Sequence, residues 1–321
     1  MGMLAHGSMI LGILLPLALF LALCGYIYER ASETKDAHHK HAAGQLVLVN
    51  GRQMHILCKG TESPTIVIEQ GAGEPAELWW PMQDRIESFA RVCTYDRAGY
   101  GWSEAAPGPR SIERRADDLH ALLAAANVPS PYILVAHSYG GLIVRWFARK
   151  YRDQVAGLVL VDTPDEGAIY RPEVLTLYGR FRFMCRALQA SAYFGLPRLL
   201  RNLFPVLRAG ITFVRPQEYA AAADDLTSLE NEKPQYRVPG GLGSLDDLPL
   251  TVITHGQPFP GPFATLENGW IEGQQRLAAL SRNSKLITAE KSNHMVQLDE
   301  PELVADAIRR VHGMSMSKSE F

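Results

Sequence analysis

Short apolar runs recur along the chain after residue 42 and alternate with amphipathic segments. Two of them, 45–50 and 52–58, are separated by Asn50-Gly51, a pair typical of a two-residue β-hairpin turn. Further apolar runs, each the length of a buried strand, occupy 65–70, 91–96, 132–137, 156–162, 249–255 and 285–289. A hairpin followed by alternating strands and helices predicts an α/β fold, with a mostly parallel, doubly wound sheet covered by helices on both faces.

The segments between these runs show the periodicity of helices. Ser111 is a suitable N-cap, and one face of the helix that follows carries apolar side chains, namely Ile112, Ala116, Leu119, Leu123 and Ala126. A last helix is expected near 300–312. The stretch at about 165–245 is rich in Arg, Leu, Phe and Tyr, with helical patches and no clear strand, and it predicts a helical lid inserted between two strands.

The N-terminal 28 residues contain no charged side chain except histidine, and Met9–Tyr28 is long enough to cross a bilayer as a helix. Tyr26 and Tyr28 would lie at the interface, before the charged sequence ERASETKD. We therefore expect a single-pass membrane anchor and linker over 1–41 and an α/β domain with the lid insertion over 42–321. The alternative is secretion after signal cleavage, which the missing basic n-region and the long apolar stretch disfavour.

The composition and charge of the chain exclude some classes of binding partner. The chain has 321 residues, 47% hydrophobic and 21% charged, with a net charge of −2 and no long basic run, so nucleic acid is not an expected partner. Four cysteines show no CxxC spacing, and HHKH at 38–41 has no closed ligand set nearby. No metal or cofactor is expected.

The stretch YILVAHSYGGLIVRWFA at 132–148 passes from one apolar run to another through a single serine. A strand that ends at His137 and a helix that begins after Ser138 would expose this serine at the carboxyl edge of the sheet. Ala136 and Gly140 are small enough for so tight a turn, and the helix N-terminus directs free N–H groups towards the serine oxygen. The pattern predicts a nucleophile elbow.

With this elbow the sequence resembles the α/β-hydrolase superfamily from about residue 42 to the C-terminus. AHSYGG matches the G-x-S-x-G motif with Ala136 in place of the first glycine, and EQGAGEP (69–75) matches the oxyanion loop with Gln70 in place of histidine. YDRAGYGWS (95–103) is similar to the turn after the fourth strand, and SNHMVQLDEPE (292–302) to the histidine loop. The resemblance implies an α/β-hydrolase fold with a helical lid.

The resemblance also implies residue roles. Ser138 would be the nucleophile and His294 the general base, while the N–H groups of Ala72 and Tyr139 would form the oxyanion hole. The strand after the lid ends in VITHGQ without an acid, so Asp162, at the tip of the preceding strand, is the expected triad acid. Asp165 is the reserve candidate and is expected to be solvated.

Other histidines are given structural interpretations. His137 would pack behind the elbow, and the Asp96-Arg97 pair would brace its glycine-rich turn. The remaining histidines outside the motifs are interpreted as surface or strand residues, namely His55, His120, His255 and His312.

The predicted activity is that of a serine hydrolase, a carboxylesterase-like enzyme acting on a small, hydrophobic acyl substrate. Peptides, thioesters and a perhydrolase side reaction remain open, whereas a serine at the elbow disfavours the dehalogenase and epoxide hydrolase reactions, which use aspartate there. The alternative is a non-catalytic, membrane-tethered binding protein on the same fold.

The fold also implies that the second and fourth strands are neighbours, which would bring Cys58 beside Cys93. A disulfide between them would favour a domain outside the cytoplasm. Arg30, Lys35 and Lys40 after the span favour the opposite orientation. The sequence leaves the two possibilities open.

Overall fold

The computed structural model describes residues 2–39, 43–108, 110–207 and 213–317. Two compact units make up the chain: one joins Met1–His41 to Phe183–Ala223, and the other joins Ala42–Arg182 to Asp224–Phe321. The strands are β1 Gln45–Val49, β2 Arg52–Lys59, β3 Thr65–Glu69, β4 Val92–Tyr95, β5 Tyr132–His137, β6 Val155–Val161, β7 Leu250–His255 and β8 Ser284–Ala289. The α-helices are α1 Gly2–His39, α2 Trp80–Ile86, α3 Ile112–Ala125, α4 Gly140–Lys150, α5 Glu166–Ile169, α6 Pro172–Ala192, α7 Leu196–Leu203, α8 Pro216–Glu230, α9 Glu267–Ala278, α10 Val296–Asp299 and α11 Pro301–Met316.

The second unit contains one sheet of eight strands in the order β1-β2-β4-β3-β5-β6-β7-β8. β1 pairs with β2, and β2 with β4, in antiparallel fashion, while every other pair is parallel. Asn50 and Gly51 both have positive φ, 50° and 78°, as a type I′ hairpin turn requires. The predicted α/β fold and all eight predicted strands are confirmed.

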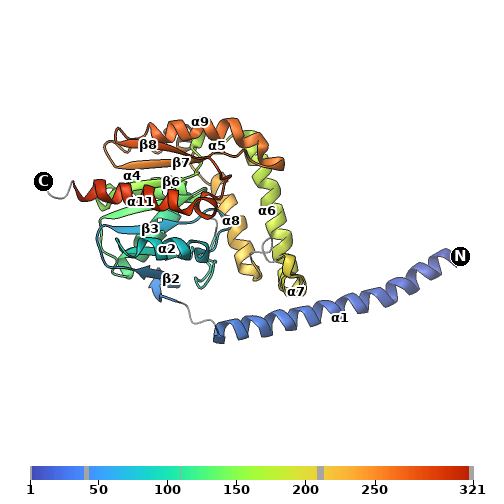
Figure 1. The fold of residues 1–321 in the computed structure, drawn as a ribbon. Helices are drawn as coiled ribbons and strands as arrows, with labels where there is room; N and C mark the ends of the chain where they lie inside the picture. Colours follow the sequence, from blue (N-terminus) through green and yellow to red (C-terminus); the bar gives the residue numbers. More distant parts are fainter. Residues whose placement is uncertain (1, 40–42, 109, 208–212, 318–321) are drawn as a thin grey trace. The chain divides into compact units, whose positions relative to one another are not determined.

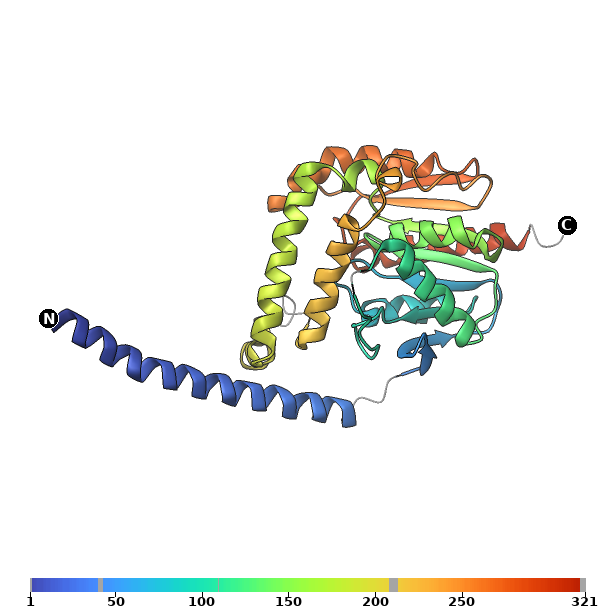
Figure 2. The same cartoon turned by 180° about the vertical axis from the view of Figure 1, so that it is seen from behind.

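Helices cover both faces of this sheet. Figure 1 shows α2 and α11 on one face, and Figure 2, turned by 180°, shows α3 and α4 on the opposite face. Consecutive residues of β5 alternate between the two cores: Leu134 packs with the α3 and α4 side, whereas Ile133 and Val135 pack with the α2 and α11 side. The sheet is therefore doubly wound, as the apolar runs of its central strands β5 and β6 predict.

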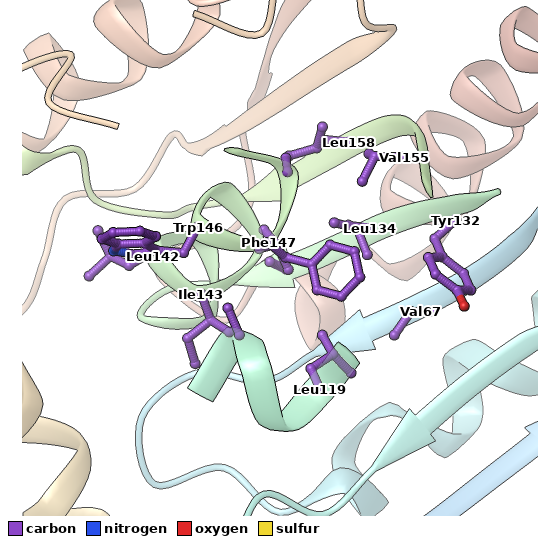
Figure 3. Packing of buried hydrophobic residues seen from close by; sticks show 14 of the residues in the cluster. Val67, Leu119, Tyr132, Leu134, Leu142, Ile143, Trp146, Phe147, Val155 and Leu158 are labelled. Atoms are coloured by element: carbon purple, nitrogen blue, oxygen red, sulfur yellow. The ribbon is translucent and has the colours of Figure 1, made fainter. Parts of the chain in front are cut away.

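α4 is buried along most of its length. Leu142, Ile143, Trp146 and Phe147 pack in the same core as Leu134 (Figure 3). Burying an aliphatic or aromatic side chain of this size stabilises a fold by about 1.5–3 kcal/mol. This packing fixes the helix whose first turn follows Ser138.

The predicted lid is helical. Between β6 and β7, the described residues form α5, α6, α7 and α8 without a strand. The Ser111 side chain accepts a hydrogen bond from the Arg114 N–H and so caps α3, as predicted.

In the other unit, α1 continues beyond the apolar stretch through residues 29–39, which were expected to be a linker. Its segment Leu14–Asp36 is long and apolar enough to cross a membrane, with a mean hydropathy of 1.4, and 6% of it is buried. Residues 40 and 41 of the HHKH sequence lie outside the described residues.

Candidate active site

Three neighbouring strands end side by side at the carboxyl edge of the sheet and supply the polar groups of the site. Ser138 follows β5, Asp162 follows β6, and His255 is the last residue of β7. The Ser138 N–H donates to the Val161 carbonyl at 3.2 Å, and the Asp162 N–H to the Ile253 carbonyl at 2.7 Å. Backbone pairing thus holds all three strand ends in register.

The turn at Ser138 has the strained geometry of an elbow. Ser138 has a φ of 49°, in the left-handed region that non-glycine residues seldom adopt, and α4 begins two residues later. A side chain at Gly140 would collide with the backbone carbonyls of Glu69 and Gln70. A small residue at this position is therefore required by the close approach of the 69–75 loop.

Ser138, His294 and Asp162 form a continuous series of hydrogen bonds. The Ser138 hydroxyl lies 2.9 Å from His294 Nε2, and His294 Nδ1 lies 2.6 Å from Asp162 Oδ2. Because a carboxylate can only accept, Nδ1 carries the proton and leaves Nε2 free to accept from the serine. The structure brings together the three side chains that the sequence selects.

Asp162 is buried, and its carboxylate accepts several hydrogen bonds. Trp270 Nε1 donates to Oδ1 at 3.0 Å, and the backbone N–H of His255 donates to the same oxygen at 3.2 Å. His255 Nδ1 donates at 2.8 Å. Burial alone would raise the pKa of Asp162, but hydrogen bonds from His255 and His294 outweigh it and lower the pKa far below its usual range.

His255 is the site residue that sequence reasoning missed. Its buried ring contacts Asp162 on one side and Glu267 through Nε2 at 3.3 Å on the other. The interpretation as a strand histidine is confirmed, because His255 ends β7, but it did not foresee that the ring holds the candidate acid. One signal was available: His255 occupies the strand end where the superfamily most often carries its acid.

Asp165, the reserve acid, lies elsewhere. Its side chain caps α5 by accepting from the Ala168 N–H at 2.8 Å, and Arg276 Nε donates to it at 2.5 Å. The expectation that it is solvated is wrong, because it is only 2% exposed. Neither contact connects it to His294.

His137 packs directly behind the elbow, as expected. Its ring centroid lies 4.6 Å from that of His294, and its Nε2 lies 2.8 Å from the His294 carbonyl oxygen. On its other side, Nδ1 lies 2.6 Å from Glu74 in the 69–75 loop. Burial lowers the pKa of His137, but Glu74 outweighs this and raises it above its usual value.

Glu74 in turn shapes the loop that carries Ala72. Its carboxylate accepts from the Gly71 N–H at 2.9 Å. Burial would raise the pKa of Glu74, but the field of His137 and its hydrogen bond lower it to about 2. Within the described part of the chain, the backbone N–H groups of Ala72 and Tyr139 donate no hydrogen bond to another residue.

Arg97 fixes the same loop from the other side. Its guanidinium donates to the carbonyls of Gln70 and Gly71 at 2.7 and 2.6 Å, and it pairs with buried Asp225 of α8 at 2.9 Å. Asp96 instead accepts from the Trp102 N–H at 3.0 Å and contacts His55. Asp96 therefore braces its own glycine-rich turn, as interpreted, whereas the Arg97 side chain braces the 69–75 loop instead.

Opposing influences act on the pKa of His294, and their net effect lowers it. Burial favours its neutral form most strongly, the hydrogen bond to Asp162 raises the pKa, and the nearby charge of His137 lowers it again. A lowered pKa favours the neutral form of His294, which is the form that can accept a proton. Among the described residues, no group of three or more metal-ligating side chains is placed to hold a metal ion.

Comparison with known proteins identifies the fold. The sequence matches a family model described as alpha/beta hydrolase fold over residues 64–191. It is 28% identical over 254 residues to "Uncharacterized protein YqjL" of Bacillus subtilis, covering 78% of this chain and 84% of that protein.

Solved structures give the same result. A thermophilic esterase from Thermogutta terrifontis superposes with a TM-score of 0.62 and 24% identity, covering 84% of this chain and 98% of that chain. The Cif epoxide hydrolase from Acinetobacter nosocomialis superposes with a TM-score of 0.68 and 16% identity, covering 89% and 96%. These likenesses concern the fold, while the chemistry depends on the side chains at its carboxyl edge.

Proposed function

Since this chain belongs to the α/β-hydrolase superfamily, we propose that it is a serine hydrolase that cleaves carboxylic esters through an acyl-enzyme on Ser138. The observation that carries the proposal is the series of hydrogen bonds from Ser138 to His294, 2.9 Å, and from His294 to Asp162, 2.6 Å. This geometry supports a catalytic triad whose members come from three separate loops at one edge of the sheet.

Acylation would proceed from this geometry in two steps. Ser138 Oγ attacks the ester carbonyl carbon while its proton passes to His294 Nε2, and the carbonyl π electrons move to the oxygen. His294 then gives that proton to the leaving alcohol as the carbon–oxygen bond breaks. Water repeats the sequence on the acyl-enzyme and releases the acid.

The oxyanion formed in both steps requires donors that are not already engaged. We assign this role to the backbone N–H groups of Ala72 and Tyr139, which donate to no other described residue. Tyr139 precedes α4, so the helix dipole favours negative charge at the same place. A donor of this kind contributes on the order of 3 kcal/mol to stabilising the transition state.

Covalent labelling tests the nucleophile. A fluorophosphonate probe should label the full-length protein and should not label Ser138→Ala, while Ser244→Ala, which changes an exposed serine, should be labelled like the wild type. Failure of a folded wild-type protein to react would overturn the proposal. That outcome would favour the non-catalytic, membrane-tethered binding protein.

We further propose that α1 anchors the enzyme as a single-pass membrane protein and that the acyl group is hydrophobic. The support is the exposed apolar stretch within Leu14–Asp36 and the apolar, arginine-rich lid. The full chain should resist extraction by alkaline carbonate and keep its N-terminal residues by mass spectrometry. A released protein that begins after the apolar stretch would instead indicate secretion after signal cleavage.

A further inference from the structure

The part of the lid that belongs to the same compact unit as α1 carries an unusual surface. We define the lid tip as residues 193–207, which include α7. Its exposed side chains are mostly large and apolar, and they include Phe194, Leu196, Leu199, Leu203, Phe204 and Val206. Soluble surfaces seldom expose so many neighbouring apolar side chains, so this segment is suited to contact an apolar phase.

The sequence around the lid tip contains positively charged side chains and no acidic ones. No Asp or Glu occurs from residue 174 to residue 217. The same stretch contains seven arginines, at positions 180, 182, 186, 198, 201, 208 and 215. Arginine combined with Leu and Phe is the composition of segments that lie at the surface of a membrane containing anionic lipid.

α7 carries its exposed apolar side chains on one face and its buried arginine on another. Leu196, Leu199 and Leu203 are spaced as one helical face, and all three are exposed. Arg198, on another face, is buried against α1, where it pairs with Glu29 at 2.8 Å and with Asp36 at 2.7 Å. The apolar face of α7 therefore remains free while its opposite side is fixed to the N-terminal helix.

The contacts with α1 show which part of that helix the lid tip packs against. A side chain at Gly25 would collide with the carbonyl of Phe194, and one at Gly195 would collide with the Tyr28 ring. Asn202 donates to the Tyr28 hydroxyl at 3.1 Å. The lid tip thus lies beside the last turns of the apolar stretch, where a spanning helix leaves the hydrocarbon and its tyrosines meet the headgroups.

We propose that the lid tip is a membrane-docking surface that inserts its apolar side chains into the interface of the bilayer that α1 spans. The proposal rests on the anchoring role of α1 proposed above. Phe194 and the apolar face of α7 enter the boundary between headgroups and acyl chains, and Arg201 of α7 lies near lipid phosphates. The exposed apolar surface is thereby covered by lipid.

Site-specific fluorescence in vesicles tests this placement. The full-length protein carrying Cys24→Ser and Cys185→Ser receives one further change, Leu203→Cys, and is labelled with the environment-sensitive dye NBD. Leu298→Cys, an exposed leucine of α10 in the other unit, is the matched control, and Leu19→Cys reports on α1. All three proteins are inserted into vesicles of phosphatidylcholine and phosphatidylserine.

NBD at position 203 should show blue-shifted emission and at least two-fold quenching by lipid-borne doxyl groups, while NBD at 298 should be quenched only by aqueous iodide. If iodide quenched NBD equally at 203 and 298 while position 19 was exposed to lipid, the proposed docking surface would be wrong. The proposed anchoring role of α1 would still hold. A blue shift at 203 that depends on protein-to-lipid ratio would show that a second copy covers the surface, and would also overturn it. Water exposure at position 19 would contradict the anchor itself.

Discussion

At the scale of single residues, the site is organised around one buried carboxylate. Asp162 has a positive φ of 45°, and its carboxylate receives hydrogen bonds from His294, His255 and Trp270. A buried carboxylate without such donors would become protonated or destabilise the fold. The three donors therefore keep Asp162 charged and aimed at His294.

Replacing this carboxylate tests its role directly. Asp162→Asn keeps the shape of the side chain but no longer fixes the proton of His294 on Nδ1. We expect kcat to fall by a factor on the order of 10³–10⁴ with little change in KM. Steady-state kinetics on a soluble aryl ester, with folding checked by circular dichroism, would measure this. Near-normal turnover would exclude Asp162 as the acid.

Asp165→Asn is the matched comparison. It should leave turnover within a few-fold of the wild type, because Asp165 contacts Arg276 and the start of α5 rather than His294. Its effect should appear in stability, since a cap and a buried charge pair are weakened. A loss of turnover as large as that of Asp162→Asn would contradict the assignment.

The protonation of His294 predicts the pH dependence. His294 must be neutral to accept the serine proton, so kcat/KM should rise with pH through the pKa of His294 and then level off. Burial lowers this pKa, the hydrogen bond to Asp162 raises it, and the nearby His137 lowers it, with a net decrease. The midpoint of the acid limb should therefore lie below about 6.5, the usual value for histidine.

A profile of kcat/KM between about pH 4 and pH 8 would test this expectation against the ordinary value for histidine. Ser244→Ala should give the same midpoint as the wild type, because Ser244 is exposed and its hydroxyl donates to the Leu280 carbonyl. A midpoint at or above the ordinary value would mean that His294 is charged in the resting enzyme or is not the base.

At the scale of elements, the elbow depends on how closely α4 and the 69–75 loop approach each other. Gly140→Ala would press a methyl group against the carbonyls of Glu69 and Gln70. We expect a loss of about 1–3 kcal/mol in the free energy of unfolding. Fluorophosphonate labelling should also slow, because the displaced loop carries Ala72. Urea unfolding and labelling rates would measure the two effects.

Gly179→Ala controls for the generic effect of replacing a helical glycine. Gly179 lies within α6, where an added methyl group meets no atom within 4 Å other than those of its chain neighbours and its own helix backbone. This change should be neutral or stabilise the protein by about 0.5–1 kcal/mol through the higher helix propensity of alanine. If both variants unfolded at the same urea concentration, the steric argument for Gly140 would fail.

Much of the fold could be predicted from sequence because the inner strands of its sheet are buried on both faces. Such strands consist of uninterrupted apolar residues, and β5, β6 and β7 are visible as runs like YILVAH and GLVLV. The hairpin was visible because Asn50 and Gly51 are among the few residues that tolerate its dihedral angles. For the buried strands and for the hairpin, the residues of the segment itself were sufficient to predict the structure.

The features that sequence reasoning missed depend on contacts between distant residues. His255 acts on Asp162 from 93 positions away, and nothing adjacent to His255 in sequence reveals that partner. Likewise, Glu29 is buried through Arg198, 169 positions away, so a charged stretch expected to be a linker is helical instead. Contacts between residues distant in sequence therefore determine both the role of His255 and the helical structure of residues 29–39.

At the scale of the whole molecule, the lid sequence is shared between two compact units. Part of it, Phe183–Ala223, belongs with α1, and the remainder belongs with the sheet. α6 and α8 each run from one unit into the other. The chain thus passes from the proposed membrane-facing part of the lid into the unit that contains the sheet within the helices α6 and α8.

For the proposed membrane anchor, the cysteines of the unit that contains the sheet, called here the catalytic unit after its proposed function, predict the side of the membrane on which it lies. β2 and β4 are antiparallel neighbours that pair Cys58 with Cys93, and the two residues form a disulfide. Disulfides persist outside the reducing cytoplasm. The bond therefore opposes the orientation that Arg30, Lys35 and Lys40 favour, and it predicts an external catalytic unit.

Thiol counting in denatured protein tests this orientation. The bond links residues separated by 35 positions, which should stabilise the fold by about 4 kcal/mol by restricting the unfolded chain. Cys24 and Cys185 are the two cysteines outside this disulfide. Protein purified without reductant should therefore react with alkylating reagent at two thiols, and at four after reduction. The variant Cys58→Ala with Cys93→Ala should give two in both conditions and unfold at a lower temperature. Four reactive thiols without reduction would mean that the bond does not form in the cell, and the basic residues after the span would then favour a catalytic unit in the cytoplasm.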